Sequence, residues 1–157
     1  MIAVSACLLG ENCKYNGQNN YNRRLIELLE GKEIITICPE ELGGLSTPRL
    51  AAEIIDGDGK DVLLGEAKVI NKNNEDLTAN FVKGANTSID LLREKNCSFA
   101  ILKARSPSCG SKQIYDGSFS AKKKAGIGVT AALLEKEGIR VYNEEELDEV
   151  ILKDYHK

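Results

Sequence analysis

Apolar residues in this chain are grouped into short runs that alternate with longer stretches of helical spacing. Short runs of apolar and β-branched residues predict strands at 2–6, 34–37, 99–102 and 140–142. Apolar positions three to four residues apart predict helices at 22–30, 77–95 and 127–137. Because strands and helices alternate, the pattern predicts an α/β fold with a mostly parallel sheet and helices on both faces.

The segments between these elements predict smaller additions to the fold. Residues 51–69 contain short apolar pieces broken by an Asp-Gly-Asp-Gly sequence, which predicts a small β-excursion or hairpin. Segments 40–50 and 114–126 are predicted to be functional loops. Asn143 is a predicted N-cap for a closing helix with three glutamates in its first turn. The length is typical of one domain, so we expect 1–157 to form a single three-layer domain.

Composition disfavours several classes of protein. The chain has no run of eighteen or more apolar residues, so a membrane span is not expected. Its N-terminus has no basic leader and continues directly into the first predicted strand, which predicts a cytoplasmic location. The net charge is −3, and the aromatic residues are five tyrosines and three phenylalanines. We therefore do not expect a stable complex with nucleic acid.

The chain has five cysteines, an odd and scattered set that is not typical of a disulfide framework. In a reducing compartment such thiols are buried structural residues, catalytic residues or metal ligands. The single histidine, His156, stands next to the last residue. A Ser-His-Asp triad, a Cys-His pair and a histidine-rich zinc site are therefore excluded, and a metal would be held mostly by thiolate. Acid–base chemistry would fall to carboxylate, lysine, tyrosine or serine side chains.

Three cysteines, Cys7, Cys38 and Cys109, each lie at or after the C-terminal end of a different predicted strand. Such ends share one edge of a parallel sheet, so these thiols would meet in one crevice. Three interpretations stay open: a metal site, buried small hydrophobic residues and a redox-active thiol pair. For a metal site, three thiolates without histidine fit a [4Fe-4S] cluster better than structural zinc. Cys13 is a candidate fourth ligand.

Positive charge is concentrated between residues 103 and 124. This segment contains six basic residues and only one acidic residue, Asp116. The contrast with an otherwise acidic chain favours an anionic ligand here, with a solvated surface as the alternative. Backbone N–H groups at the predicted helix start, 126–128, would suit a phosphate group. The neighbouring side chains that would assist are Lys122, Lys123 and Lys124.

Four motifs stand out along nearly the whole chain. They are VSACLLGENCKYNG, ICPEELGGLSTPR, LKARSPSCGSKQIYDGSFS and GIGVTAALLEKEGIRVYNEEEL. Taken together and in this order, they resemble the thiouracil desulfidase (TudS-type) family. The resemblance implies a Rossmann-like domain in which three cysteines hold a [4Fe-4S] cluster, and removal of sulfur from a thiolated pyrimidine base or its nucleotide. By motif position the ligands would be Cys7, Cys38 and Cys109, and Cys13 matches a position that is not a ligand.

The resemblance also implies a mechanism in which water replaces the sulfur atom, which leaves as hydrosulfide. Glu40, two residues after Cys38, is our candidate for the base, because a carboxylate is the common base available without histidine. Ser106 is our candidate for a proton donor or positioning hydroxyl, and Ser108 and lysines 122–124 for substrate contacts. The lysines favour a nucleoside monophosphate over a free base. The competing hypotheses are a non-catalytic iron–sulfur or sulfide carrier and a nucleotide-binding regulatory module.

Overall fold

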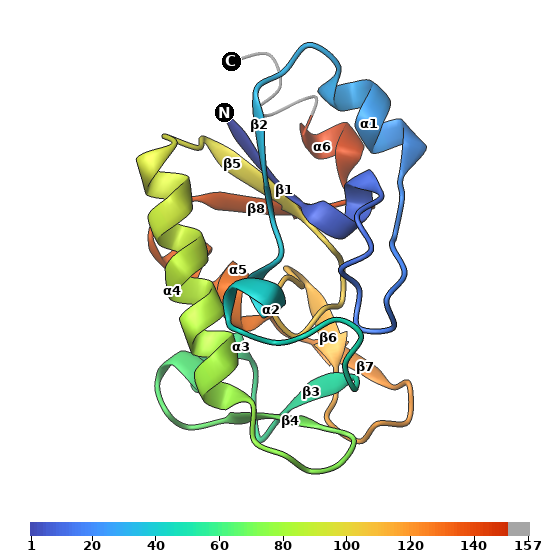
Figure 1. Cartoon of the computed structure of the whole chain (residues 1–157). Coiled ribbons are helices and arrows are strands. Elements are labelled where there is room, and N and C mark those ends of the chain that lie inside the picture. Colours follow the sequence, from blue (N-terminus) through green and yellow to red (C-terminus); the bar gives the residue numbers. More distant parts are fainter. Residues whose placement is uncertain (151–157) are drawn as a thin grey trace.

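The centre of the computed structural model, which describes residues 1–150, is a sheet of four parallel strands (Figure 1). In spatial order they are β2 (Ile34–Ile37), β1 (Ile2–Ser5), β5 (Phe99–Leu102) and β8 (Arg140–Asn143). Ile2 in β1 lies opposite both Ile34 and Phe99, which sets the register of the three strands. The four predicted strands are confirmed, with ends that differ by at most one residue.

Side chains alternate between the two faces of this sheet and form two hydrophobic cores. In β5, Ala100 and Leu102 belong to one core, whereas Phe99 and Ile101 belong to the other. Successive residues of a strand point to opposite faces, so a strand that is apolar at every position needs cover on both faces. The structure provides that cover, and the predicted three-layer α/β arrangement is confirmed.

Helices cover both faces of the sheet. α4 (Thr78–Glu94) and α5 (Val129–Lys136) contribute to the first core. α1 (Arg23–Leu29) and α6 (Leu147–Val150) contribute to the second core, and Figure 1 shows them on the opposite side of the sheet from α4. The side chain of Asn22 caps α1 by accepting an N–H hydrogen bond from its first turn (3.0 Å). No helix within residues 1–150 is long and apolar enough to cross a membrane.

Two antiparallel strand pairs lie at the lower end of the molecule in Figure 1. The first joins β3 (Ala52–Ile55) to β4 (Lys68–Asn71), with α3 (Gly59–Leu63) between them. The second joins β6 (Gln113–Tyr115) to β7 (Lys123–Ala125). The first pair confirms the predicted β-excursion. Its connection is a helix rather than a tight turn, because Asp58 accepts N–H hydrogen bonds from the first turn of α3.

Two predicted segments differ from the structure. Segment 114–126 contains strand residues of β6 and β7, which are too short and too polar to produce an alternating pattern in the sequence. The closing helix begins at Leu147, after the glutamates, because Asn143 forms a hydrogen-bonded turn before it. The Asn143 side-chain oxygen accepts the backbone N–H of Glu145 (2.8 Å), and the backbone N–H of Asn143 donates to the carboxylate of Glu146 (3.1 Å). His156 lies outside the described residues.

The order of the strands creates a point where the chain changes direction across the sheet. The chain continues from β1 through η1 (Ala6–Leu9) and α1 to β2 on one side of β1. From β2 it passes through α2 (Pro39–Leu42) and α4 and reaches β5 on the other side. In open α/β sheets, ligands bind outside the carboxyl ends of the strands at such a switch point. The topology therefore predicts a site beyond the ends of β1 and β5.

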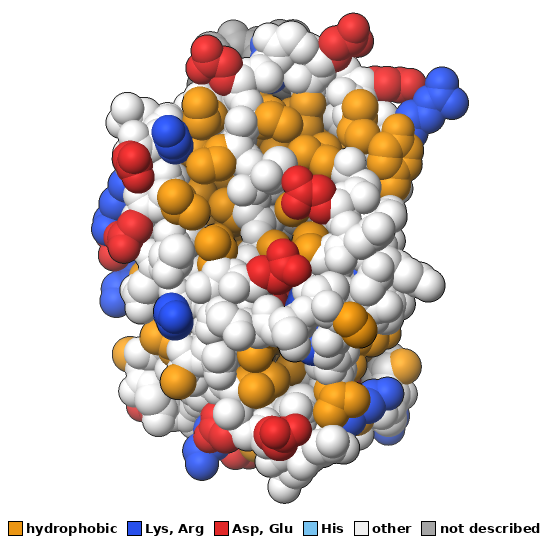
Figure 2. Space-filling view, in the orientation of Figure 1, with side chains coloured by type: hydrophobic (Ala, Val, Ile, Leu, Met, Phe, Trp, Pro, Cys, Tyr) orange, Lys and Arg blue, Asp and Glu red, His pale blue; other side chains and the backbone are white. Residues whose placement is uncertain are grey.

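The upper part of the molecule exposes apolar side chains around β2, which is an edge strand. Ile34 and Ile35 are half-buried and Thr36 is exposed, whereas residues 141–143 of β8, at the other edge, are buried. Figure 2 shows apolar side chains gathered on this face, in the region where β2 lies between α4 and α1 in Figure 1. The two edges of the sheet are therefore covered unequally.

A close backbone contact between α2 and α4 sets the position of α2. A Cβ atom on Gly84 would lie 2.0 Å from the carbonyl oxygen of Pro39. A Cβ atom on Gly43 would lie 2.1 Å from the carbonyl oxygen of Asn80. Glycine at both positions therefore allows the two backbones to touch.

The contact leads to a prediction about stability. Gly84→Ala is expected to lower the free energy of unfolding by about 1–3 kcal/mol, because the two backbones must separate to admit the methyl group. Urea denaturation measures the change. Asn86→Ala on the exposed side of α4 is the control, and we expect it to change stability by less than about 0.5 kcal/mol. Equal stability of the two variants would show that the contact does not hold α2 in place.

Candidate metal centre and substrate cavity

Three cysteines from distant parts of the sequence line one cavity of about 500 Å³. Cys7 lies in η1 after β1, Cys38 directly follows β2, and Cys109 lies in the loop after β5. These three strands are neighbours in the sheet. The structure therefore brings together the three thiols whose position at strand ends suggested a common crevice.

Cys13 also lines the cavity, and its thiol forms hydrogen bonds with those of Cys7 and Cys38. These hydrogen bonds stabilise the thiolate forms of the two partners: the pKa of Cys7 falls to about 7, and the pKa of Cys38 falls below its ordinary value. The same hydrogen bonds raise the pKa of Cys13. Donor atoms of Cys13, Cys38 and Glu41 lie within 4.8 Å of one another. Cys13 is therefore part of the thiol group at this site.

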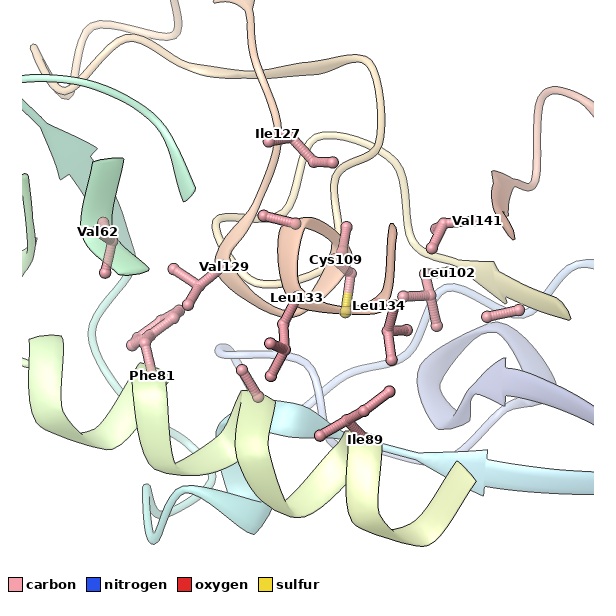
Figure 3. Close-up of a cluster of buried hydrophobic side chains, with 14 of the residues drawn as sticks. Val62, Phe81, Ile89, Leu102, Cys109, Ile127, Val129, Leu133, Leu134 and Val141 are labelled. Carbon is pink, nitrogen blue, oxygen red and sulfur yellow. The ribbon is translucent and has the colours of Figure 1, made fainter. Parts of the chain in front are cut away.

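Cys109 is more deeply buried than Cys7 or Cys38. It belongs to the first hydrophobic core, and Figure 3 shows its side chain near Leu134. Burial raises the pKa of Cys109 to about 12, and the hydroxyl oxygen of Ser108 lies 3.4 Å from its sulfur. Coordination to a metal ion would offset the cost of the buried thiolate, because metal ligation deprotonates thiols. Cys109 thus combines a core position with access to the cavity.

Glu40 lies in the same cavity and is held by two side chains. Its Oε2 atom accepts a hydrogen bond from Nε of Arg49 (2.8 Å) and lies 2.6 Å from Nη2 in an ion pair, and its Oε1 atom accepts a hydrogen bond from Ser108 Oγ (3.1 Å). The Arg49 guanidinium also donates to the carbonyl oxygen of Cys13 (2.9 Å). Charge-assisted, forked contacts of this kind fix the orientation of a carboxylate. Arg49 therefore connects the predicted base to the Cys13 loop.

The neighbouring carboxylate, Glu41, has a different environment. It is exposed, accepts a hydrogen bond from the Thr47 hydroxyl (2.6 Å), and is not among the described residues that line the cavity. The geometry therefore favours Glu40 over Glu41 as a base that acts inside the cavity.

Ser106 and Ser108 shape the turn that carries Cys109. Ser106 Oγ accepts hydrogen bonds from the N–H groups of Ser108 and Cys109, both at 3.1 Å, as serine often does in turns. The same oxygen lies 3.0 Å from Ser108 Oγ, which donates to Glu40. Two hydroxyls and the predicted base therefore form a continuous hydrogen-bonded chain on the cavity wall.

The start of α5 does not offer the N–H groups that the sequence suggested for a phosphate. The N–H groups of Gly128, Val129 and Ala131 donate to carbonyl oxygens of the loop that carries Cys109, at 2.7 to 3.0 Å. A Cβ atom on Gly128 would lie 2.6 Å from the carbonyl carbon of Ser108, so this loop folds directly onto the helix start. The N–H of Gly126 likewise donates to the carbonyl oxygen of Lys112 (3.1 Å), so neighbouring backbone uses the donors of Gly126 and Gly128, and the phosphate site at 126–128 stays a prediction without support from these contacts.

The three lysines predicted to contact substrate are not among the described residues that line the cavity. Lys122 and Lys123 are exposed, and Lys124 Nζ donates to the carbonyl oxygen of Gly57 (2.8 Å). Their role as phosphate ligands stays a prediction. The basic residues that do line the cavity are Lys14, Arg49, Lys72, Lys103 and Arg105.

Glutamates that follow β8 balance part of the positive charge of segment 103–124. The ion pairs are Lys103–Glu144 (2.8 Å), Arg105–Glu145 (2.8 Å) and Lys112–Glu146 (2.9 Å). The positive charge seen in the sequence is therefore partly neutralised in space. Lys103 is also close enough to Cys7 to contribute to the lowered pKa of that thiol.

Known proteins match this arrangement in sequence and in fold. The model of the 2-thiouracil desulfurase family matches residues 2–146. This chain belongs to that family. Uncharacterized protein YbbK of Bacillus subtilis (strain 168) is 48% identical over 151 residues, which are 96% of this chain and 100% of that protein. A solved structure of the [4Fe-4S]-dependent thiouracil desulfidase TudS is 41% identical, with a TM-score of 0.83 over 96% of this chain and 95% of its own.

In this member of the 2-thiouracil desulfurase family, three of the four motifs supply the residues gathered at the cavity. Cys7 and Cys13 come from the first, Cys38 and Glu40 from the second, and Cys109 from the third. The fourth forms α5 and β8, against which the Cys109 loop packs. The resemblance that these motifs indicated is confirmed.

Several cavity residues were not singled out from the sequence. Arg49 and the aromatic residues Tyr15, Tyr115 and Phe119 stand within the family motifs, so motif membership was the available signal for them. Glu53 and Lys72 also line the cavity but lie outside the four motifs, so no motif marked them. Their importance depends on distance in space, since a carboxylate as buried as Glu40 requires a cationic partner that no sequence spacing specifies.

Proposed function

We propose that this protein is an iron–sulfur-dependent desulfidase that hydrolyses the carbon–sulfur bond of a thiolated pyrimidine, thiouracil or its nucleotide, and releases hydrosulfide. The observation that carries the proposal is the meeting of three thiols with the Glu40–Ser108 pair in one cavity. Membership of the 2-thiouracil desulfurase family and the similarity to a [4Fe-4S]-dependent thiouracil desulfidase support it.

The donor set of the cavity fits an iron–sulfur cluster. Cys7, Cys38 and Cys109 would hold it, because thiolate is the ligand that iron–sulfur clusters use and all three thiols line the same cavity. The lowered pKa values of Cys7 and Cys38 favour thiolates at two of these positions. When bound, the cluster supplies Lewis-acidic iron with affinity for the soft sulfur atom of the substrate.

The protein's own groups account for the handling of water and protons. Arg49 and Ser108 orient Glu40. Glu40 accepts a proton from a water molecule while the oxygen atom of that water bonds to the ring carbon that bears sulfur. The carbon–sulfur bond then breaks and the electron pair leaves with sulfur as hydrosulfide. The two protons of water end on Glu40 and on sulfur, and no oxidant or reductant is needed. The Ser106 hydroxyl contacts that of Ser108 and so helps to position the hydroxyl that donates to Glu40.

The charge of the cavity supports a nucleotide over a free base. The cavity of about 500 Å³ would have to admit both the cluster and the substrate, so its volume alone does not distinguish the two substrates. Lys14 and Lys72 line the same cavity and would suit an anionic substituent on the ring. We propose that the nucleoside monophosphate is the better substrate.

Sulfide release from anaerobically reconstituted protein tests the proposal. We expect equal amounts of sulfide and pyrimidine product from thiouracil and from its nucleoside monophosphate, with the higher kcat/KM for the nucleotide. Protein stripped of iron by a chelator is the control and should release none. Loaded protein that releases no sulfide from either compound would contradict the enzyme proposal. Equal kcat/KM values would contradict the preference for the nucleotide and leave lysines 122–124 without a role in binding.

A second candidate function is a non-catalytic iron–sulfur carrier, which the position of Cys13 favours. Its thiol contacts those of Cys7 and Cys38, so a cluster held by four protein thiolates is a chemically reasonable alternative. A closed coordination set would leave no position for a substrate sulfur atom. The carrier hypothesis therefore predicts bound iron without sulfide release.

A further inference from the structure

A second carboxylate at the cavity has a different task from that of Glu40. Glu53 in β3 is half-buried and lines the cavity. Its Oε1 atom accepts hydrogen bonds from the backbone N–H groups of Gly117 (2.9 Å) and Phe119 (3.3 Å). Both donors belong to the loop between β6 and β7, which lies 64 residues further along the chain. Glu53 therefore ties this loop to the cavity wall formed by β3.

The tied loop has an unusual backbone. Phe119 has φ +55° and Ala121 has φ +62°, in the left-handed region that side chains other than glycine rarely adopt. Gly117, at φ +93°, approaches β3 so closely that a Cβ atom on it would lie 2.7 Å from the carbonyl oxygen of Ile54. Residues persist in such conformations only where their surroundings hold them, and these cluster at functional sites.

Phe119 and Ala121 line the same cavity as the three thiols. Phe119 is the aromatic residue of the described cavity wall that carries no polar group, since the others are Tyr15 and Tyr115. A pyrimidine ring is flat and aromatic, and stacking on an aromatic side chain is the common way in which proteins bind such rings. The strained loop thus presents a residue suited to the proposed substrate.

We propose that Phe119 is the apolar wall against which the pyrimidine ring of the substrate packs, and that Glu53 is the positioning residue that holds Phe119 there. The inference rests on the proposed function, because it assumes a pyrimidine substrate. It makes Phe119 a determinant of binding, whereas Glu40 and the thiols determine the chemistry. Loss of the aromatic ring at Phe119 or of the acceptor oxygen at Glu53 should therefore raise KM and leave kcat nearly unchanged.

The test of Phe119 compares two substitutions. Phe119→Leu keeps an apolar side chain but removes the aromatic ring, and it should raise KM roughly tenfold. Phe119→Tyr keeps the aromatic ring, so its KM should stay close to that of the unmodified protein. The dissociation constant of the product uridine monophosphate, measured by calorimetry, should rise together with KM in Phe119→Leu and stay unchanged in Phe119→Tyr. Unchanged KM and affinity in Phe119→Leu would overturn the assignment of Phe119.

The test of Glu53 separates positioning from a direct role of its charge. Glu53→Gln keeps a side-chain carbonyl oxygen that accepts the two N–H groups, so KM should stay near its original value. Glu53→Ala removes the acceptor and should raise KM about as much as Phe119→Leu, roughly tenfold. If Glu53→Gln raises KM as much as Glu53→Ala does, the positioning role is overturned, because glutamine keeps the acceptor oxygen and lacks only the negative charge of glutamate.

Controls keep the two proposals distinguishable. Tyr21→Leu, which changes an exposed aromatic residue outside the cavity, should leave KM unchanged. Iron content and melting temperature, measured for every variant, show that an altered KM is not the result of unfolding. If the unmodified protein releases no sulfide, the proposed function fails. If the unmodified protein does release sulfide, and Phe119→Leu binds substrate and product as tightly as the unmodified protein does, only the inference about Phe119 fails.

Discussion

Glu40→Gln is expected to reduce kcat for sulfide release by roughly a hundredfold or more, which is the usual contribution of a general base. Glutamine has nearly the same shape, and its single carbonyl oxygen can still accept from Arg49 while its amide N–H group donates to Ser108 Oγ, so the turn after Cys38 should persist. It cannot take a proton from water. Iron content and the visible absorbance of the cluster should stay unchanged, because Glu40 is not one of the proposed ligands.

The comparison with other carboxylates makes this result specific. Glu66→Gln changes an exposed carboxylate outside the cavity and should retain full activity. Glu41→Gln tests the neighbouring carboxylate, which is exposed and contacts Thr47. Unchanged kcat in Glu40→Gln would remove Glu40 from the mechanism. Loss of activity in Glu41→Gln instead would assign the role of the base to Glu41.

Serine substitutions of the thiols should have the second large effect. Cys7→Ser, Cys38→Ser and Cys109→Ser are each expected to lose most of the roughly four iron atoms that a [4Fe-4S] cluster contributes per chain, together with sulfide release. A serine hydroxyl is a poor ligand for such a cluster, and two remaining thiolates do not hold it. Iron analysis and visible absorbance after anaerobic reconstitution measure the loss.

Cys13→Ser decides between the open and the closed coordination set. If three thiolates hold the cluster, this variant should keep its iron and most of its activity, because a serine hydroxyl can still donate hydrogen bonds to the sulfur atoms of Cys7 and Cys38. Cys97→Ser is the matched control, because Cys97 is half-buried and does not line the cavity within the described chain. Loss of iron in Cys13→Ser would instead support the carrier hypothesis.

The local sequence was sufficient to predict those strands, helices and site positions that depend on interactions between nearby residues. The apolar run FAIL of β5 specifies a strand buried on both faces, and the spacing of Phe81, Ala85, Ile89 and Leu92 specifies the buried side of α4. The position of Cys38 directly after β2 follows from the same pattern, since Pro39 ends the strand and begins α2.

Predictions failed or stayed incomplete where a residue's partner is distant in the sequence. The N–H groups of Gly128 and Val129 looked available for a phosphate, but they donate to the loop that carries Cys109. The basic segment looked like an anion site, but Arg105 pairs with Glu145, which lies 40 residues away. Such pairs form only when the β5 and β8 ends come together, so no local pattern reveals them.

By itself, the sequence determined the alternation of strands and helices and the family to which the chain belongs. It also placed Cys7, Cys38 and Cys109 at strand ends, because the two-residue period of a buried strand and the residues that end it are properties of the local chain. Only the tertiary structure decided that Cys13 joins these thiols, that Arg49 and Ser108 hold Glu40, and that Glu53 holds Phe119. Those contacts depend on the order β2-β1-β5-β8 and on how the loops fold over its C-terminal edge, which side-chain spacing along the chain does not encode.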